Sequence, residues 1–393
     1  MITNSFKKMG SVYERSKFFM IITGLWMLPF TDNPILRKFY KIYSVVLHSV
    51  FGMFSLSLMI RFVELVTEGA KSDTLFGSLT LTIILTMMIY KIVIYLKNGI
   101  PYLFYQVVDE EGKYLNSSEE EIRSTYLKQA TYFNWTTSIQ IMCTFFTVAM
   151  FIVSNIYKKI THSFKPGEVF MYEVWVPFDK VKYDMFISVF DVCMVTIGFF
   201  NNVAVATAPQ SLMVFLTAQL RILQIRIRKV FISSNIKEQT VIFKVKELIR
   251  RHQNIIQFAT KLNDGIKNVI FIEYILASVN VAAALLHILT LEFSGEMIFS
   301  IFHFLLLLVQ IFILAFTAQE INTQSFNISN AVYESSWIDQ SEPIKRMMHI
   351  MLMRAQKPLA ISIGPFRPMN IEAALMTLKG AYSYTSLMIQ KYI

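Results

Sequence analysis

Residues 40–62 read YKIYSVVLHSVFGMFSLSLMIRF, an apolar stretch whose only charges lie near its ends. A helix of about 20 apolar residues crosses the hydrocarbon core of a bilayer, so this stretch predicts a membrane span. Six further stretches have the same character. The seven predicted spans are 40–62, 74–96, 132–156, 185–208, 268–290, 297–318 and 369–390. The sequence therefore predicts an all-α fold, a seven-transmembrane helical bundle.

The composition of the whole chain agrees with a multi-pass membrane protein. Of the 393 residues, 54% are hydrophobic and 16% are charged, against about 25% charged in soluble domains. The net charge of +10 comes from basic residues that lie mostly between the spans, as expected for loops that face anionic lipid, so no nucleic acid partner is expected. No cleavable signal peptide is expected, because the basic first forty residues lack a small-residue cleavage site.

Residues that would carry enzymatic chemistry are sparse. The six histidines show no HxxH or HxxxH spacing, which excludes the histidine clusters of membrane desaturases. The sequence has no nucleophile elbow, P-loop or dinucleotide fingerprint. Cys143 and Cys193 both fall within apolar stretches and are expected to be buried thiols. The protein is therefore predicted not to be an enzyme, and no cofactor or metal is expected.

The charges of the loops predict a cytoplasmic N-terminus and an extracellular C-terminus. With this orientation the inside segments hold 25 Lys and Arg residues and the outside segments hold 7. A G-protein-coupled receptor has the opposite orientation, and its DRY and NPxxY motifs are missing from this sequence. The predicted organisation is a cytoplasmic segment (1–40), spans one to four (41–208), a cytoplasmic helical anchor (209–266), spans five and six (267–320), a second anchor segment (321–367) and the last span (368–393).

Three basic amphipathic stretches predict helices beneath the membrane, at 218–232, 240–262 and 344–357. Each has apolar side chains at near-helical spacing, and the third places Met347, Ile350, Met351 and Arg354 on one face. They are either solvated helices that lie under the lipid headgroups or a helical bundle that contacts neighbouring subunits. The second interpretation is preferred because three such stretches occur.

The last predicted span carries a polar stripe. At 100° per residue, one helical face holds Glu372, Met376, Lys379, Ser383, Ser386, Leu387 and Gln390. Charges at membrane depth normally face a protein interior or water. The stripe therefore either packs against helices of the same bundle or lines an aqueous path formed by several chains. In the second case Leu387 forms a constriction that gates by dewetting, and Ser383 and Gln390 present uncharged polar groups to the path.

The end of the chain resembles that of insect odorant receptors. The segments that carry the resemblance are AVYESSWID (331–339), IKRMMHIMLMRAQKPLAI (344–361) and LKGAYSYTSLMIQKYI (378–393), after spans of the same number and orientation. The resemblance implies a ligand-gated, non-selective channel for monovalent cations and calcium, which forms a heterotetramer with an odorant co-receptor in the plasma membrane of sensory neurons. It implies that Leu387 lies at the gate of a pore lined by the last helix. The co-receptor has a longer insertion than 209–266 accommodates, so the chain resembles a tuning subunit.

The resemblance also implies that a small volatile odorant binds in the outer half of the helical bundle. The main candidate residues for this site are Phe76 and Thr80 in span two, Met150, Phe151 and Ser154 in span three, and Phe186, Phe190 and Asp191 in span four. Further candidates are Leu79, Ile83, Thr147, Phe299, Phe302 and His303. Aromatic and Met side chains with a few polar groups suit a volatile ligand. Phe170, Tyr172 and Trp175 in the outer loop are candidates for a lid.

Two other functions remain open from the sequence. A gustatory-type ligand-gated channel would share the topology and the pore. A seven-span receptor that signals through a cytoplasmic partner would use the basic anchor helices as its docking surface.

Overall fold

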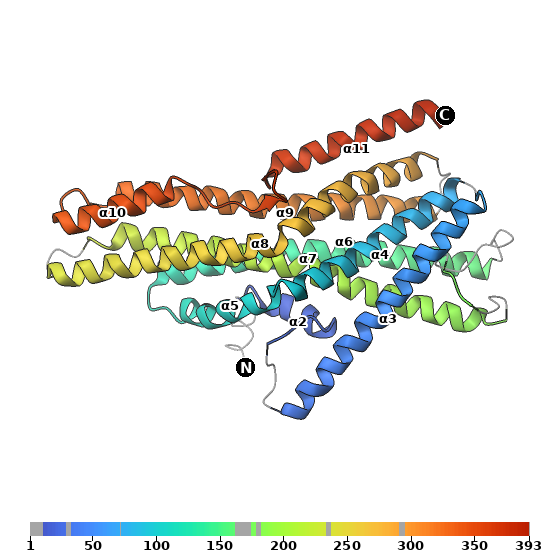
Figure 1. Cartoon of the computed structure of the whole chain (residues 1–393), viewed down its shortest axis with the longest axis horizontal. Coiled ribbons are helices and arrows are strands. Elements are labelled where there is room, and N and C mark those ends of the chain that lie inside the picture. Colours follow the sequence, from blue (N-terminus) through green and yellow to red (C-terminus); the bar gives the residue numbers. More distant parts are fainter. Residues whose placement is uncertain are drawn as a thin grey trace.

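The computed structural model describes residues 11–28, 33–70, 72–161, 174–177, 182–232, 237–290 and 295–392. Within these residues the chain is almost entirely helical, and its long helices run roughly along one axis (Figure 1). The long helices are α3 (Pro34–Thr67), α4 (Ser72–Lys97), α6 (Glu120–Ile160), α7 (Asp184–Lys229), α8 (Glu238–Thr290), α9 (Gly295–Glu334) and α11 (Ile371–Tyr392). The shorter elements are α2 (Glu14–Ile22), α5 (Ile100–Leu115), α10 (Glu342–Ala355), β1 (Ser362–Ile363) and β2 (Arg367–Pro368).

The long helices coincide with the predicted spans. Among the described residues, six helices are long and apolar enough to cross a membrane, and they contain the first six predicted spans. The seventh predicted span corresponds to α11, which is not among these six. It lies apart from the rest of the bundle in Figure 1 and packs on α8 and α9.

Three spans continue without a break into the predicted anchor. The helices α7, α8 and α9 run through positions 208, 266 and 320, at which the sequence suggests segment boundaries. The 53 residues of α8 correspond to about 80 Å of helix, well beyond the roughly 30 Å of a hydrocarbon core. Their extensions meet α5 and α10 at one end of the molecule, opposite the end that holds the C-terminus (Figure 1). A displacement of one of these spans is therefore transmitted directly to the anchor.

The apolar face of α10 differs from the predicted one. The helix buries Ile344, Met348, Met351 and Ala355 against α8 and α9. Of the four residues on the predicted face, only Met351 is buried, and Ile350 is exposed. Met353, outside the predicted face, is also exposed. The sequence expectation placed the stripe about one position away, because spacing alone cannot show which side of a helix meets its neighbours.

The N-terminal segment is part of the core. Phe19, Met20 and Trp26 are buried, and α2 packs on α7. The buried carboxylate of Glu111 in α5 accepts hydrogen bonds from Ser11 Oγ at 2.8 Å, from the Val12 amide at 2.8 Å and from the Tyr126 hydroxyl at 2.5 Å. Burial raises the pKa of Glu111, and these three hydrogen bonds oppose the rise. These hydrogen bonds join Ser11 and Val12 of the N-terminal segment to α5 and α6.

A small hairpin turns the chain into α11. Strands β1 and β2 pair antiparallel on either side of residues 364–366. Gly364 adopts a left-handed backbone with φ of +57°, and its amide donates to the Lys267 carbonyl at 3.0 Å. A Cβ at this position would lie 3.1 Å from Phe271, so the close approach to α8 requires glycine.

The cysteines correct one expectation from the sequence. Both are free; Cys143 is half-buried, but Cys193 is exposed on the surface of the bundle. An apolar stretch does not distinguish the inward from the outward side of a span, because lipid accepts a thiol as readily as the protein interior does.

Substitutions at two adjacent residues of α10 test folding and subunit assembly separately. Met351 is 3% exposed and Ile350 is 61% exposed. We expect Met351→Asp to destabilise the folded chain by on the order of 3 kcal/mol, because it buries an unpaired charge in place of an apolar side chain. Ile350→Asp should leave the melting temperature of the detergent-solubilised chain nearly unchanged while weakening subunit association, measured by size-exclusion chromatography. Equal melting temperatures for the two variants would contradict this packing.

Candidate ligand cavity and pore helix

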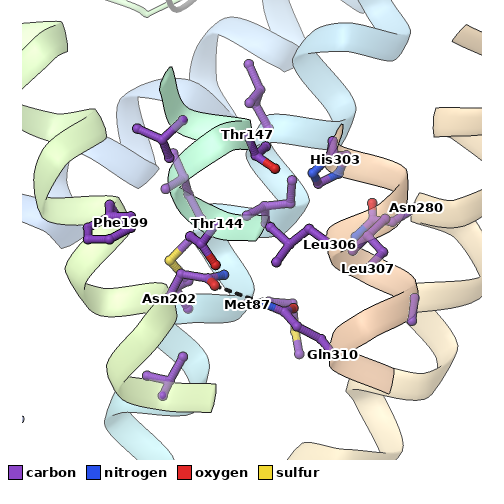
Figure 2. Close-up of a pocket in the computed structure, with 18 of the residues that line it drawn as sticks. Met87, Thr144, Thr147, Phe199, Asn202, Asn280, His303, Leu306, Leu307 and Gln310 are labelled. Atoms are coloured by element: carbon purple, nitrogen blue, oxygen red, sulfur yellow. Dashed lines mark hydrogen bonds between the residues drawn. The ribbon is translucent and has the colours of Figure 1, made fainter. Parts of the chain in front are cut away.

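A cavity of about 150 Å³ lies within the bundle, enclosed by α4, α6, α7, α8 and α9. Figure 2 shows side chains from these helices pointing into it, among them Met87, Phe199 and Leu306. Most of the wall is aliphatic or aromatic. The polar and charged residues of the wall are Lys91, Thr144, Thr147, Asn202, Glu273, Asn280, His303 and Gln310. A mainly apolar cavity with a few polar groups is the usual form of a small-molecule site.

The hydroxyl groups of the wall present acceptors to the cavity. Thr144 Oγ1 donates to the Gln140 carbonyl at 2.7 Å, and Thr147 Oγ1 donates to the Cys143 carbonyl at 2.8 Å, each one helical turn back along α6. Because each hydroxyl proton is used within the helix, its oxygen retains only lone pairs. Both threonines therefore favour a ligand that can donate a hydrogen bond.

Three amide side chains also line the cavity. Gln310 Nε2 donates to Asn202 Oδ1 at 2.8 Å, drawn as a dashed line in Figure 2, which joins α9 to α7. Asn280 on α8 is 6% exposed, and its Oδ1 has no hydrogen-bond partner among the described residues. An unpaired buried amide oxygen costs free energy. The carboxamide of Asn280 is thus a second polar group available to a ligand.

An aromatic wall completes the outer side of the cavity. The rings of Phe151 and Phe299 lie 5.1 Å apart, and Phe299 stacks on the His303 ring at 5.9 Å with an angle of 13° between planes. Aromatic rings prefer offset-stacked or edge-to-face arrangements, and each ring presents a large apolar surface. This wall suits a ring-containing or other compact apolar ligand.

Charged side chains close the inner end of the cavity. Lys91 Nζ on α4 lies 2.5 Å from Glu273 Oε1 on α8, with side-chain exposures of 12% and 23%. Charges within a span are expensive unless they are paired or face an interior cavity, and this pair meets both conditions. The sequence analysis did not select these residues, although an ionisable residue inside a predicted span is itself the signal that would have found them.

The predicted ligand residues divide between the cavity and other places. Phe151 lines it, together with the further candidates Thr147, Phe299 and His303. The side chain of Phe76 lies outside the described residues. The remaining main candidates do not line this cavity; they are Thr80, Met150, Ser154, Phe186, Phe190 and Asp191. The cavity lies further from the outer end of the bundle than expected, because the first α7 residue in its wall is Val195.

The outer part of α7 packs into an apolar cluster, the outer cluster, which borders the cavity and shares Val195 with its wall. Phe190 contacts Phe54 on α3 with ring centroids 5.8 Å apart, in a cluster that also contains Leu58 and Val195. Phe186 is 62% exposed and Asp191 is fully buried. Of the predicted lid residues, Phe170 and Tyr172 lie outside the described residues, and the Trp175 amide donates to the Ser57 carbonyl at 3.3 Å.

The polar stripe of α11 faces away from the bundle. Ala373, Ala374, Ala381 and Thr385 are buried against the neighbouring helices. Glu372, Met376, Lys379 and Ser383 are exposed on the opposite side, and Leu387 is 64% exposed. The side chain of Gln390 lies outside the described residues. The described part of the stripe therefore does not pack against helices of its own bundle. In an assembly it would face either an aqueous path between chains or a neighbouring subunit.

One residue connects the cavity with α11. Leu307 lines the cavity and also packs in a cluster with Val281 of α8 and Ala381 of α11. A ligand that displaces Leu307 would therefore disturb the cluster in which Ala381 of α11 packs. Neither Leu307 nor the α8 wall of the cavity was selected from the sequence.

These features define a multi-pass membrane protein with an internal small-molecule cavity. A family model described as 7tm Odorant receptor matches residues 71–382. The chain therefore belongs to the odorant receptor family.

Relatives of known sequence agree with this assignment over part of their length. The chain is 28% identical over 149 residues to Odorant receptor 10 of Aedes albopictus, which is 38% of this chain and 40% of that protein. It is 29% identical over 153 residues to Odorant receptor Or2 of Anopheles gambiae, 39% of this chain and 40% of that protein. The matched stretch thus spans about two fifths of the length of these relatives.

A solved structure agrees with the fold over nearly the whole chain. The insect olfactory receptor OR5 from Machilis hrabei, solved in complex with eugenol, superimposes with a TM-score of 0.79 at 16% identity, covering 96% of this chain and 97% of that one. A second structure of the same receptor gives the same TM-score. The likeness confirms the predicted seven-span helical bundle.

The exposure of α11 predicts a pattern of chemical reactivity. If the stripe lines an aqueous path in an assembled receptor, Ser383→Cys should react with a water-soluble thiol reagent. Ala381→Cys, on the buried face, is the matched control and should react at least ten times more slowly. Labelling rates measured by mass spectrometry check the order, and faster reaction at position 381 would contradict it.

Proposed function

We propose that this chain is the tuning subunit of an odorant-gated, non-selective cation channel. A volatile ligand binds in the cavity behind Phe151, α11 lines the pore, and monovalent cations and calcium pass through it. The channel is a heterotetramer with an odorant co-receptor in the plasma membrane. The observation that supports the proposal is that Leu307 lines the cavity and also packs against the cluster that contains Ala381 of α11.

The wall of the cavity suggests the chemistry of the ligand. A cavity of about 150 Å³ lined by apolar side chains takes a molecule of roughly the size of benzene. The acceptors of Thr144 and Thr147 and the carboxamide of Asn280 favour a compact or ring-containing volatile with one hydroxyl or N–H group. Hydrogen bonds to these groups would orient the ligand, and the aromatic wall would supply most of its burial.

The pore requires more than one chain. Each chain contributes one α11, so several copies around an axis are needed to enclose water with the exposed stripe. Leu387 is exposed on this side and suits a narrow apolar ring that closes by dewetting, while Ser383 provides a polar surface further in. We place Gln390 at the outer mouth by its position on the same helical face. The family assignment favours this odorant function over the gustatory alternative.

The deciding experiment is voltage clamp of cells that express the chain with and without an odorant co-receptor, screened against a panel of volatiles. We expect odorant-evoked current only when both proteins are present, and without added nucleotide. Current that requires a nucleotide-coupled cytoplasmic partner would favour the seven-span signalling receptor instead.

Two phenylalanines provide a matched test of the ligand site. Phe151 and Phe190 pack against the same outer cluster, but only Phe151 also lines the cavity. Phe151→Ala should lower apparent odorant affinity about 5- to 150-fold, because loss of a buried phenyl contact costs on the order of 1–3 kcal/mol. Phe190→Ala should leave potency within about threefold. Concentration–response curves measure both, and the opposite order would move the ligand to the outer cluster.

Two substitutions in α11 test the pore. Leu387→Ala should raise the current in the absence of odorant, because it widens an apolar constriction. Gln390→Lys should reduce cation conductance, because a unit charge about 4 Å from a permeating cation costs about 1 kcal/mol in water and about 4 kcal/mol at an effective dielectric of 20. Both variants should keep odorant potency. Co-receptor subunits will dilute these effects, so single-channel conductance is the measurement. Unaltered permeation in Gln390→Lys would remove α11 from the pore.

A further inference from the structure

The Lys91–Glu273 ion pair joins two helices that have different roles. The pair spans 2.5 Å between α4, which lines the cavity, and α8, on which α11 packs. Lys91 lies six residues before the inner end of α4, about 9 Å into the span. At this depth neither charge is fully hydrated, so each depends strongly on the other.

The pair lies between two pockets. It lines the inner end of the ligand cavity, and it also lines a second pocket of about 20 Å³ further toward the anchor. One face of the ion pair is therefore available to a ligand in the cavity. The other face looks into a space large enough for one water molecule.

The second pocket is rich in hydrogen-bond acceptors. Gln140 Oε1 on α6 and Gln210 Oε1 on α7 are buried without a hydrogen-bond partner among the described residues. Pro209 also lines the pocket and has no amide proton to give to the carbonyl of Val205, one turn back along α7. Lys91 has three N–H donors and gives one to Glu273. Its ammonium can thus connect α6 and α7 to the pair through one water.

The position of Glu273 on α8 connects the pair to the pore helix. Val281 and Ala282, about 12 Å further along the same helix, form a cluster with Ala381 of α11. A rigid helix transmits a restraint over this distance, so holding α8 at Glu273 also fixes the surface on which α11 rests. A ligand that fills the cavity excludes water from the ion pair, and the attraction between the charges grows as the local dielectric falls.

We propose that the Lys91–Glu273 pair is a positioning element that couples occupancy of the cavity to α11. The inference rests on the proposed channel function. The pair makes α4 and α8 move as one body when the cavity is filled, and α11 follows α8. Without it a ligand still binds, but its binding no longer displaces the pore helix.

Four variants separate coupling from stability. Lys91→Met and Glu273→Gln each remove one charge, and the reversed pair Lys91→Glu with Glu273→Lys restores the attraction. The double variant Lys91→Met with Glu273→Gln leaves no unpaired charge, so it is expected to fold even where the single variants do not. Lys159→Met is the matched control, because Lys159 joins α6 to Asp184 of α7 at 2.8 Å and lines neither pocket.

Odorant-evoked current, normalised to receptor at the cell surface, is the first readout. The neutral double variant should lose about tenfold in maximal current while its half-maximal odorant concentration stays within about threefold of the unmodified chain. The reversed pair should recover at least half of the maximal current, and the control should match the unmodified chain. A neutral double variant with full current, or one that changes only the half-maximal concentration, would overturn the proposal.

The melting temperature of the detergent-solubilised full chain is the second readout and needs no current. Each single variant should melt several degrees lower, and the reversed pair should regain most of the loss. A reversed pair that melts no higher than the single variants would show that the ion pair does not hold α4 and α8 together, and would overturn the proposal. If the variants show this melting pattern but the unmodified chain gives no odorant-evoked current, the result counts against the proposed channel function instead.

Discussion

The structure depends on the inability of hydrocarbon to hydrogen-bond. Inside a bilayer every backbone group must find a partner within its own helix, and every polar side chain must face protein or water. Because lipid is as apolar as leucine, hydrophobicity does not draw the spans together. Polar residues therefore mark the faces that must meet protein or water rather than lipid. In this chain they lie at the cavity wall, at the Lys91–Glu273 pair and along α11, and these are the places to which function is assigned.

The cavity and α11, the proposed pore helix, meet through α8. This helix contributes Glu273 and Asn280 to the wall of the cavity and Val281 to the cluster around Ala381, within three turns of one another. The same helix then continues into the anchor and packs on α10. A single rigid element thus touches the ligand site, the proposed pore and the anchor. Such an arrangement needs no chain of small side-chain displacements, since a shift of α8 reaches all three at once.

The sequence predicted the fold better than the site, and the reason is physical. Spans follow from length and apolarity, and the exposed stripe of α11 follows from 3.6-residue periodicity, because both depend on the helix alone. The cavity depends on how five helices cross, which spacing does not specify. Phe190 and Asp191 were therefore selected although the cavity begins at Val195, and the buried face of α10 was displaced by about one position. Lys91 and Glu273 carried a readable signal, because ionisable residues inside a span seek a partner.

The central claim is that ligand occupancy of the cavity controls a pore formed by α11. The most direct measurement is an electron cryomicroscopy structure of the chain assembled with an odorant co-receptor, with an activating odorant bound. It should show odorant density between Phe151 and Asn280, with the faces of α11 that carry Ser383 and Leu387 around a central axis. Odorant density beside Phe54 and Phe190, or an axis lined by another helix, would contradict the claim.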